Sequence, residues 1–488
     1  MTTDIDTIRD ALGEADFTLA GIGRAGIDLG LGVRSADIAV LERALEPVEP
    51  LATLIRLFVL GSPVSVSAAT ERLGADVLRA IADENLAETA GEVVGPLIRL
   101  TPWRGLVIAH DPDPAGDLWP EHVSGPTPAA DALIRLVTPN GGAALDLGTG
   151  SGLLGAALAG GQRTVVATDI NPAAIRLARL TAGLNGLANV EVVEGDLFEP
   201  VTGRSFDLIV ADPPFVISPE TDLLFRHSPF ARDELSREVV RSAAAHLTDG
   251  GFAYLLVNWV QEPGADWLEV LGDWLAETGC DAIGLLHGID DPLSYAVRWT
   301  GREQYLRPAR HGETLDRWLA HFRDAGIAAV GTGALILRRR SGANWIHGLP
   351  LSGETRGEAG AQIQAMFAAR DRLAASPDPA RRHALVLESA FRIEAPHRLA
   401  QSLVNESGEY VVEPASLVLD EGLGTPTTID PDLIPVILRL DGSQVVGDIA
   451  REVAEATGAD VDAVSRRSVA IVRELFERGV AIPVDMGG

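Results

Sequence analysis

Residues 143–159 read AALDLGTGSGLLGAALA, and this stretch decides the kind of fold. An apolar, strand-forming run passes through Asp146, and glycines follow it before a helix-like run begins: Gly148, Gly150, Gly152 and Gly155. Glycines between a strand and a helix let the backbone approach a ligand closely and leave the first N–H groups of the helix free to bind it. The stretch therefore predicts a ligand-binding turn. The alternative is a tight strand–helix turn that binds nothing.

Strands and helices alternate outward from this stretch. Strand candidates lie at 143–148, 163–169, 190–196, 206–212 and 250–258, with two more at 281–288 and 334–340. Helix-like stretches separate several of them, at 152–160, 172–185 and 232–247. Alternation of this kind argues for right-handed crossovers and a parallel sheet. The sequence predicts an α/β, doubly wound, Rossmann-like domain with seven strands.

The chain is long enough for several domains. Residues 1–110 read as helical stretches and a hairpin, which predicts a winged-helix-like domain that docks a substrate or supports the structure, with DNA binding as the alternative. The α/β domain takes 111–341, and a linker with a helix takes 342–385. Residues 386–488 are expected to form a mainly helical accessory domain. The apolar spacing over 429–483 resembles that of PqqD-like peptide-binding modules and is also typical of a winged helix.

Composition excludes several classes of chemistry. The 40 basic residues are all arginine, so Schiff-base catalysis by lysine, a pyridoxal phosphate anchor and a P-loop of the GxxxxGK[ST] type are impossible. Cys280 is the one cysteine, which excludes an internal disulfide framework and a cysteine-rich metal site, and no metal is expected. The net charge of −29 argues against a protein that mainly grips nucleic-acid backbones.

The same features indicate where the protein works. No apolar run approaches the roughly 18–20 residues that cross a bilayer, and the acidic N-terminus lacks the layout of a signal peptide. We therefore expect a cytoplasmic protein. The use of arginine in place of lysine suggests a bacterium with a GC-rich genome.

Carboxylates follow the next two strands. The second strand ends TDIN, which puts Asp169 at its tip, and the third ends EGDLF, with Asp196 just before Leu197. Asp169 can accept hydrogen bonds from both hydroxyls of a ribose, and Asp196 can accept from the exocyclic amine of adenine. The plain alternative for Asp196 is a helix N-cap. Residues 150–155 also satisfy GxGxxG, so a nicotinamide dinucleotide is a rival ligand.

Together these motifs resemble the class I S-adenosylmethionine-dependent methyltransferases, with a DxGxGxG turn and acids after strands two and three. The resemblance covers roughly residues 120–340 and implies S-adenosylmethionine as the cofactor. It implies that the glycines wrap the methionine part and that Asp146 orients its amino group. It also implies that Asp169 holds the ribose, and that Asp196 and Leu197 take the adenine. The full expected cofactor-binding set is Asp146, Gly148, Thr149, Gly150, Gly152, Asp169, Ile170, Asn171, Asp196, Leu197 and Asp212.

The fourth strand runs into a distinctive loop, LIVADPPFVISPE at 208–220. Proline cannot continue a sheet's hydrogen-bond ladder, so the strand stops at Asp212 and a stiff loop follows. DPPF resembles the [D/N]PP[Y/F] motif of methyltransferases that alkylate planar nitrogens. On that resemblance, Asp212 and the carbonyl of Pro213 accept the two N–H hydrogens of the substrate nitrogen. Pro213 and Pro214 hold the loop rigid, and Phe215 stacks on the planar group. These four residues are the expected reacting shell, with a plain strand terminator as the alternative.

The run from 144 to 215 most resembles the protein-glutamine N5-methyltransferases and the ribosomal RNA small-subunit guanine methyltransferases. The glutamine enzymes and many of the guanine enzymes carry Asn first in the motif, whereas Asp212 is of the kind familiar in adenine-N6 enzymes. The expected reaction is N-methylation of a planar amide or amine of a protein or peptide, because accessory domains and an acidic charge suit a partner other than nucleic acid.

Four alternatives stay open. They are methylation of an RNA or DNA base, methylation of a small molecule or natural product, a cofactor-binding scaffold without enzyme activity, and an NAD-dependent oxidoreductase. The last leaves the DPPF loop unexplained, and a Tyr-x-x-x-Lys pair is impossible in a chain without lysine.

Further residues are candidates for the walls of the site. Residues 216–235 follow the motif and are expected to lid the pocket. The candidates for substrate contact there are Arg226, His227 and Arg232, with a solvated loop as the alternative. At the end of the fifth strand, pocket lining and core packing are both open for Asn258, Trp259 and Trp267.

Overall fold

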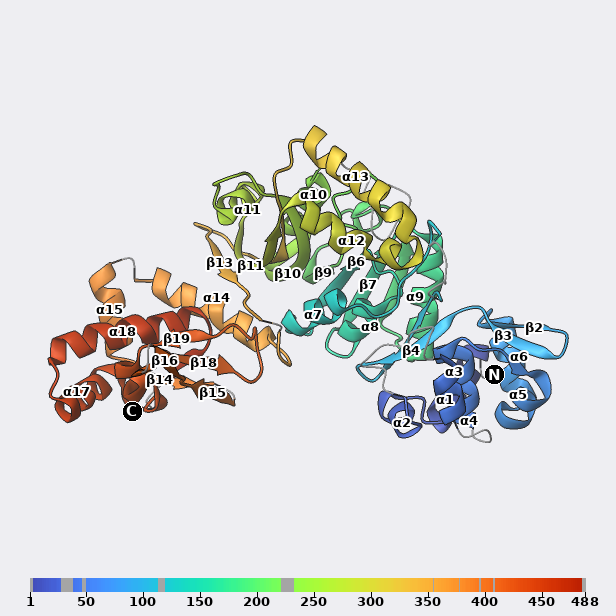
Figure 1. Cartoon of the computed structure of the whole chain (residues 1–488), viewed down its shortest axis with the longest axis horizontal. Helices are drawn as coiled ribbons and strands as arrows, with labels where there is room; N and C mark the ends of the chain where they lie inside the picture. The colour runs from blue at the N-terminus through green and yellow to red at the C-terminus, as the bar shows by residue number, and fades with distance from the viewer. Residues whose placement is uncertain are drawn as a thin grey trace. The chain divides into compact units, whose positions relative to one another are not determined.

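The computed structural model describes residues 3–27, 38–45, 50–112, 119–220, 232–353, 355–376, 378–394, 396–406 and 409–484. The chain divides into two compact units, which contain all the elements labelled in Figure 1. The first unit is Met1–Ile134 with Pro139–Leu349, and the second is Arg135–Thr138 with Pro350–Gly488.

An eight-stranded sheet organises the first unit, in the order β13-β11-β12-β10-β9-β6-β7-β8. Its strands are β6 (Ala143–Leu147), β7 (Thr164–Asp169), β8 (Val190–Glu194), β9 (Phe206–Ala211), β10 (Leu247–Val260), β11 (Cys280–Asp290), β12 (Val330–Arg339) and β13 (Ile346–Pro350). Strands β6 to β10 pair in parallel, and β12 is antiparallel to both β10 and β11. The predicted α/β, Rossmann-like core with a mostly parallel sheet is confirmed. Two details differ from the prediction, since β12 is reversed and β13 adds an eighth strand.

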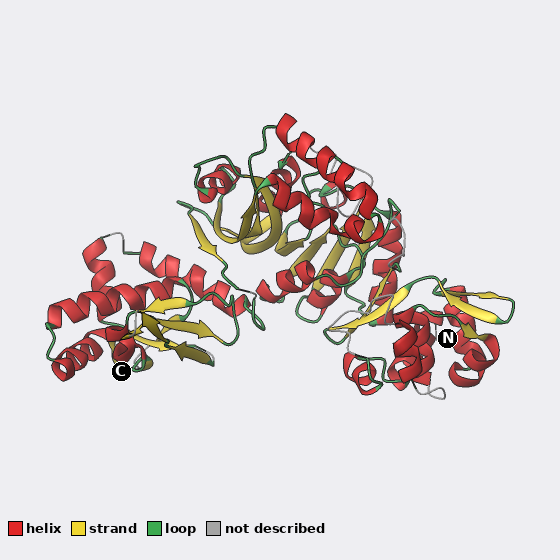
Figure 2. Cartoon of the chain, in the orientation of Figure 1, coloured by secondary structure: helices red, strands yellow, loops and turns green. Residues whose placement is uncertain are grey.

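Helices cover both faces of this sheet, as the red ribbons of Figure 2 show. The helices that follow individual strands are α8 (Leu153–Ala159), α9 (Pro172–Leu184), α10 (Glu234–His246) and α11 (Trp267–Leu275), and α7 (Pro128–Leu136) precedes β6. Helices α10 and α11 pack on the face that carries Leu145 and Leu147. Helix α8 lies on the other face, where Gly155 approaches Asp146 and Ala167. A strand covered on both faces reads as a continuous apolar run, which is why the sequence predicts β6 correctly.

The N-terminal part of the first unit shares a hydrophobic core with α9. Its elements are α1 (Asp4–Glu14), α2 (Leu19–Arg24), α3 (Ile38–Ala44), α4 (Pro50–Leu54), the π-helical turn η2 (Ile55–Leu60), β1 (Val64–Ser65), α5 (Val66–Leu73), α6 (Ala75–Asp83), β2 (Ala87–Ala90), β3 (Val93–Pro96), β4 (Arg99–Trp103) and β5 (Leu106–His110). The side chain of Asn185, just after α9, accepts from the N–H of Val107 (2.9 Å) and donates to its carbonyl (2.8 Å). Thr181 accepts from the N–H of Ala109 (3.0 Å). The side chains of Asn185 and Thr181 thus provide hydrogen-bond partners for backbone groups of β5, as a neighbouring strand would.

The second unit mixes strands and helices. Its helices include α14 (Gly360–Ala374), α15 (Pro379–Leu387), α17 (Val446–Thr457) and α18 (Val461–Glu477). Its strands are β14 (Ala390–Ile393), β15 (His397–Ala400), β16 (Leu403–Glu406), β17 (Glu409–Val412), β18 (Ala415–Leu419), β19 (Thr427–Ile429), β20 (Asp441–Val445) and β21 (Ala481–Val484). The prediction of a mainly helical domain for 386–488 is therefore wrong. These strands are short, and several are half exposed, so they carry too few alternating apolar residues to stand out in the sequence.

The segment expected to be a linker with a helix, 342–385, contributes regular elements to both units. Strand β13 joins the edge of the large sheet beside β11. Helix α14 buries Ile363, Met366 and Phe367, and α15 follows it. The sequence therefore predicts α14 and gives no sign of β13.

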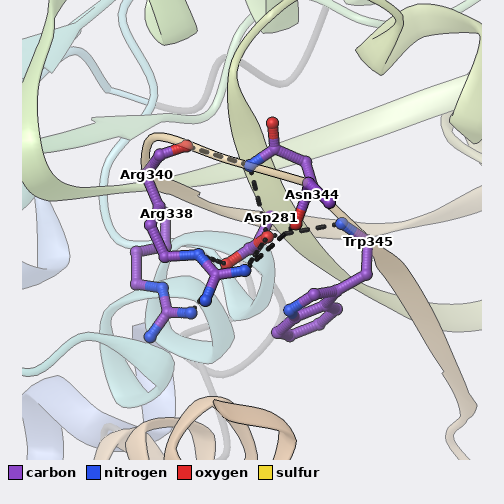
Figure 3. A network of polar contacts seen from close by, with 6 residues as sticks. Asp281, Arg338, Arg340, Asn344 and Trp345 are labelled. Atoms are coloured by element: carbon purple, nitrogen blue, oxygen red, sulfur yellow. Dashed lines mark hydrogen bonds and ion pairs between the residues drawn. The ribbon is translucent and has the colours of Figure 1, made fainter. Parts of the chain in front are cut away.

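A buried carboxylate holds the edge of the large sheet together (Figure 3). Asp281 of β11 has a fully buried side chain and pairs with Arg338 (2.6 Å) and Arg340 (2.9 Å) near the end of β12. Its Oδ1 also accepts from the Asn344 side chain and the Trp345 backbone N–H, both at 3.3 Å. One carboxylate thus ties β11 and β12 to the chain that leads into β13.

We predict that Asp281→Ala destabilises the first unit by about 3–5 kcal/mol, because two partly buried guanidinium groups lose their counter-charge. Asp281→Asn keeps two hydrogen-bond acceptor sites on one oxygen and should cost less. Urea denaturation followed by tryptophan fluorescence measures both. Equal stability of Asp281→Ala and the wild type would contradict this role.

Candidate active site

The predicted cofactor residues collect at the carboxyl ends of the central strands. In the sheet, β6 lies between β9 and β7, so the chain moves outward from β6 in opposite directions. Open α/β sheets bind ligands outside the strand ends at such a switch point. Asp146 in β6, Asp169 at the end of β7 and Asp212 just after β9 lie around it.

Asp146 has a fully buried carboxylate. Its Oδ2 accepts hydrogen bonds from the hydroxyl of Thr149 (2.5 Å) and the N–H of Gly155 (2.7 Å). Its Oδ1 is buried and has no hydrogen-bond partner among the described residues. Burial raises the pKa of Asp146 to about 6, although both hydrogen bonds act against the shift. A cation placed at Oδ1 would satisfy this oxygen and favour the ionised form.

The glycines of the turn serve two different purposes. Gly148, Gly150 and Gly152 all have left-handed φ values, of 70°, 55° and 79°. A Cβ atom at Gly152 would come within 2.9 Å of the Cα of Ala178, so Gly152 permits close packing on α9. A Cβ atom at Gly148 or Gly150 would meet no described atom within 4 Å, so the backbone there borders open space. That space is where a ligand can approach the backbone.

Asp169 ties the glycine turn to the start of α9. One oxygen accepts from the N–H of Gly150 (2.9 Å) and the other from the N–H of Asn171 (2.9 Å). Burial raises the pKa of Asp169, and these hydrogen bonds oppose the shift. Asn171 caps α9 by accepting from the N–H of Ala173 (3.0 Å). Ile170 lies between these residues and is 54% exposed, which leaves an apolar surface beside the carboxylate.

Asp196 and Leu197 follow β8. Asp196 is exposed, and Leu197 adopts a φ of 43°, which is uncommon for a residue with a side chain. The preceding Gly195 donates its N–H to the carbonyl of Asp169 (2.9 Å), which joins the ends of β7 and β8. The structure therefore brings Asp196 and Leu197 to the same edge of the sheet as Asp169.

The DPPF loop leaves β9 at Asp212. The N–H of Phe215 donates to the carbonyl of Pro213 (2.7 Å), which closes a tight turn within the motif. Asp212 is half-buried, and its pKa is raised to about 7 by desolvation first and by the nearby Asp146 second. The carbonyl of Pro213 keeps a second lone pair, so it can still accept from a substrate.

An aromatic wall backs this loop, and sequence reasoning missed it. Helices α12 (Pro292–Leu306) and α13 (Pro308–Asp324) bring Tyr295, Trp299, Trp318 and Phe322 against the loop. Phe215 meets Trp299 edge to face, with ring centroids 6.2 Å apart. The signal in the sequence is a pair of aromatic residues four apart in each helix, which reads as ordinary core packing.

The other candidates have different outcomes. Arg226 and His227 lie outside the described residues, as does most of the lid expected over 216–235. Arg232 donates to the carbonyl of Ala325 (3.0 Å) and pairs with Glu262 (3.1 Å), so its described contacts are structural.

Trp259, in β10, and Trp267, at the start of α11, pack in the core. Trp259 is fully buried, stacks on Trp267 with centroids 6.0 Å apart, and donates to Gln261 (2.9 Å). Asn258 is fully buried and donates its amide N–H to the hydroxyl of Tyr295 (2.6 Å).

Two kinds of feature are missing from the part of the chain that the structure describes. No group of three or more His, Cys, Asp or Glu side chains is arranged to hold a metal ion. No helix is both long and apolar enough to span a bilayer. His110, His122 and His287 therefore belong to no such group among the described residues.

The residues present fit S-adenosylmethionine on three observations. Oδ1 of Asp146, which has no partner in the part of the chain that the structure describes, matches an ammonium group. The open space at Gly148 and Gly150 matches a ligand that lies against the backbone. Exposed Ile170, beside Asp169, offers an apolar surface to a nucleoside.

Comparison with known proteins gives matches in two parts of the chain. Residues 127–270 match the family described as methyltransferase small domain, and residues 14–97 match a domain of unknown function, DUF7059. The release factor glutamine methyltransferase of Deinococcus radiodurans is 32% identical over 263 residues, which cover 50% of this chain and 83% of that protein. The ribosomal RNA small subunit methyltransferase C of Salmonella arizonae is 34% identical over 129 residues, which cover 26% of this chain and 34% of that protein.

Solved structures show more distant likenesses. A 16S rRNA methyltransferase of T. thermophilus, in complex with AdoMet and guanosine, matches with a TM-score of 0.28 and 18% identity, over 63% of this chain and 69% of that chain. A methyltransferase from Pyrococcus furiosus matches with a TM-score of 0.29 and 18% identity, over 49% of this chain and 90% of that chain. Neither likeness says anything about the substrate of this chain.

We predict that the affinity for S-adenosylmethionine rises about tenfold or more between pH 5.5 and pH 8. The pKa values of Asp146 and Asp212 are raised to about 6 and about 7, so both carboxyls are largely protonated at the lower pH and cannot pair with a cation. Binding near pH 6.5 should release protons, which calorimetry detects as an enthalpy that depends on the buffer. In Asp212→Asn the part of the rise centred near pH 7 should disappear. A flat affinity profile would contradict the assignment.

We also predict that Asp212→Asn stabilises the ligand-free protein at pH 8 by roughly 1–2 kcal/mol. The folded pKa of Asp212 is raised above its ordinary value of 3.8, so the ionised carboxylate destabilises the fold above pH 7, and this cost disappears as the pH falls toward 4. The gain in thermal midpoint should therefore be present at pH 8 and absent near pH 4. Asp249→Asn, at an exposed position near the start of β10, is the matched control and should change the thermal midpoint at neither pH.

Proposed function

Because this chain is an S-adenosylmethionine-dependent methyltransferase and belongs to the family of the release factor glutamine methyltransferases, we propose that it N-methylates a planar amide of a protein or peptide. When bound, S-adenosylmethionine supplies an electrophilic methyl group on a sulfonium. The cofactor and the reaction class expected from the sequence are confirmed. The protein substrate and the residue roles below are proposals.

The observation that carries the proposal is a pair of hydrogen-bond acceptors on a rigid loop next to the cofactor residues. The lone pair of an amide nitrogen is delocalised, which makes it a poor nucleophile. Asp212 and the carbonyl of Pro213 can accept the two N–H bonds of a primary amide and orient its lone pair. The tight turn from Phe215 to Pro213 fixes these acceptors before the substrate arrives, so little reorganisation is needed.

Asp212 also suits the proton that the reaction releases. Methylation of a primary amide nitrogen forms an N–C bond as the bond between the methyl group and the sulfonium sulfur breaks, which leaves a neutral thioether, and the nitrogen then loses one proton to become neutral. A carboxyl with a pKa raised to about 7 can accept this proton near neutral pH and pass it to solvent. Phe215 lies beside the acceptors and offers a flat apolar surface to the planar group.

The remaining residues take the roles that the family resemblance implies. Asp146, with its unpartnered oxygen, would hold the ammonium group of the cofactor. Asp169 would hold the ribose, with Asp196 and Leu197 at the adenine. The turn residues Gly148, Thr149, Gly150 and Gly152 would line the methionine part, and Ile170 and Asn171 the nucleoside.

The N-terminal region is our candidate for recognition of a protein substrate. Between residues 50 and 96 the order is helix, strand, two helices and two strands, and the three strands pair as β1-β3-β2. This order supports the winged-helix-like domain expected from the sequence. Its core is shared with α9, so a partner docked there would be held in a fixed position relative to Asp169.

Methylation of an RNA base is the second candidate function. Asp212 stands where the motif of the glutamine enzymes has Asn, and a ribosomal RNA methyltransferase matches 26% of this chain. The net charge of −29 weighs against it, because binding to nucleic acid requires basic surface.

The test is transfer of labelled methyl groups from S-adenosylmethionine to a purified bacterial release factor and, separately, to ribosomal RNA. We predict label in the release factor and N5-methylglutamine in its digest. Asp212→Ala should lower turnover by about 1000-fold, since it removes an acceptor that acts in the transition state, whereas Asp212→Asn should keep part of the activity. The control is the affinity at pH 8 for S-adenosylhomocysteine, which lacks the sulfonium charge that Asp212 would attract, and it should stay near that of the wild type. Label in RNA alone would support the second candidate, and equal activity in all three proteins would remove Asp212 from the reacting shell.

A further inference from the structure

We propose that Tyr295 is a positioning residue that fixes the acceptor loop, 212–217, in the shape needed for methyl transfer. Tyr295 belongs to α12 and lies outside the glycine turn, the acidic positions and the DPPF motif described above. The inference rests on the proposed function insofar as this loop holds the substrate nitrogen.

Helices α12 and α13 form a hairpin inserted between β11 and β12, drawn in yellow in Figure 1. The inner side of the hairpin buries Tyr295, Trp318 and Phe322 against Val216 and Ile217 of the loop. The ring of Tyr295 lies 5.9 Å from that of Phe322 and 6.4 Å from that of Trp318, centroid to centroid. The hairpin is therefore a wall on which the loop rests.

The hydroxyl of Tyr295 makes the specific contact between wall and loop. Tyr295 is fully buried, and its hydroxyl accepts from the backbone N–H of Ile217 (3.2 Å). It also lies 2.6 Å from the amide nitrogen of Asn258, which is fully buried on β10. One hydroxyl thus links the loop to the central sheet.

The bond between Tyr295 and Asn258 holds for either orientation of the amide. Oδ1 of Asn258 is buried without a hydrogen-bond partner among the described residues, so a flipped amide would accept from the hydroxyl instead of donating to it. Burial also raises the pKa of Tyr295 far above its ordinary value, so the hydroxyl stays protonated at working pH. In both orientations the hydroxyl remains fixed between Ile217 and Asn258.

The loop is consequently held at both ends. Asp212 continues directly from β9, and Ile217 is held by Tyr295. Between them, two prolines and the turn from Phe215 to Pro213 leave little freedom. If the hydroxyl is removed, the N–H of Ile217 is buried without a partner, and the loop gains freedom at the end away from Asp212. Misplacing the acceptors by about 1 Å is enough to slow a reaction that depends on orientation by roughly 100-fold.

Tyr295→Phe keeps the aromatic ring and removes the hydroxyl, and with it the hydrogen bonds to Ile217 and Asn258. We expect turnover at saturating substrate to fall about 10- to 100-fold, with the affinity for S-adenosylhomocysteine within about twofold of the wild type. Phe322→Leu is the matched control, because it loosens the same aromatic cluster without touching the hydroxyl. It should lower the thermal midpoint at least as much as Tyr295→Phe does and leave turnover within about threefold of the wild type. Equal losses of turnover in the two variants, or unchanged turnover in Tyr295→Phe, would overturn the proposal.

A second measurement separates this inference from the proposed function. Hydrogen exchange of the Ile217 amide in the ligand-free protein needs no substrate, and it should speed up by about tenfold or more in Tyr295→Phe while staying near the wild-type rate in Phe322→Leu. Unchanged exchange in Tyr295→Phe would refute the positioning role even if the enzyme methylates a protein. Faster exchange in an enzyme that methylates no protein would refute the proposed function and leave the structural link intact.

Discussion

A carboxylate that is buried without a counter-charge among the described residues is the feature on which the site depends. Asp146 uses one oxygen to bind Thr149 and Gly155, and these two bonds join the end of β6 to the start of α8. Its other oxygen is buried with no partner among the described residues, and Asp212 adds a second negative group nearby. When one of these carboxylates is ionised, its charge disfavours ionisation of the other. A ligand that carries positive charge relieves this repulsion and is therefore favoured. The proposed site therefore links the electrostatic cost of these carboxylates in the ligand-free protein to its affinity for a cationic cofactor.

The motifs that could be predicted from the sequence are those whose local structure is determined by residues next to one another in the chain. Left-handed φ values at Gly148 and Gly150 require glycine, and the strands around them are buried on both faces, so a few adjacent residues fix turn and sheet together. The direction of β12 could not be predicted, because a strand buried on both faces has the same pattern in either direction. The link between Tyr295 and Ile217 spans 78 residues of sequence and depends on one hydroxyl, which no local pattern records.

Helix α9 connects the cofactor side of the first unit with its N-terminal part. It begins at the cap Asn171, next to Asp169, and ends at Asn185, whose side chain completes the hydrogen bonding of β5. A helix of 13 residues is about 20 Å long and stiff over that length. The N-terminal part is therefore fixed to the helix that begins next to Asp169, the proposed ribose-binding acid, which argues against a freely swinging docking domain.

In the proposed reaction, Asp212 at the first position of the DPPF motif would restrict which nitrogen can react. Asp212 and the carbonyl of Pro213 are both acceptors, so they match a group with two N–H bonds, such as a primary amide or an aryl amine. A hydroxyl or a secondary amine offers only one hydrogen and would leave one acceptor unpaired. An Asn at this position could also donate a hydrogen bond to the substrate, but it could not take up the proton that the methylated nitrogen must lose. Compared with Asn, Asp212 lacks an N–H donor but is a proton acceptor whose pKa is raised to about 7, so in the proposed reaction one side chain would both orient the nitrogen and remove its proton.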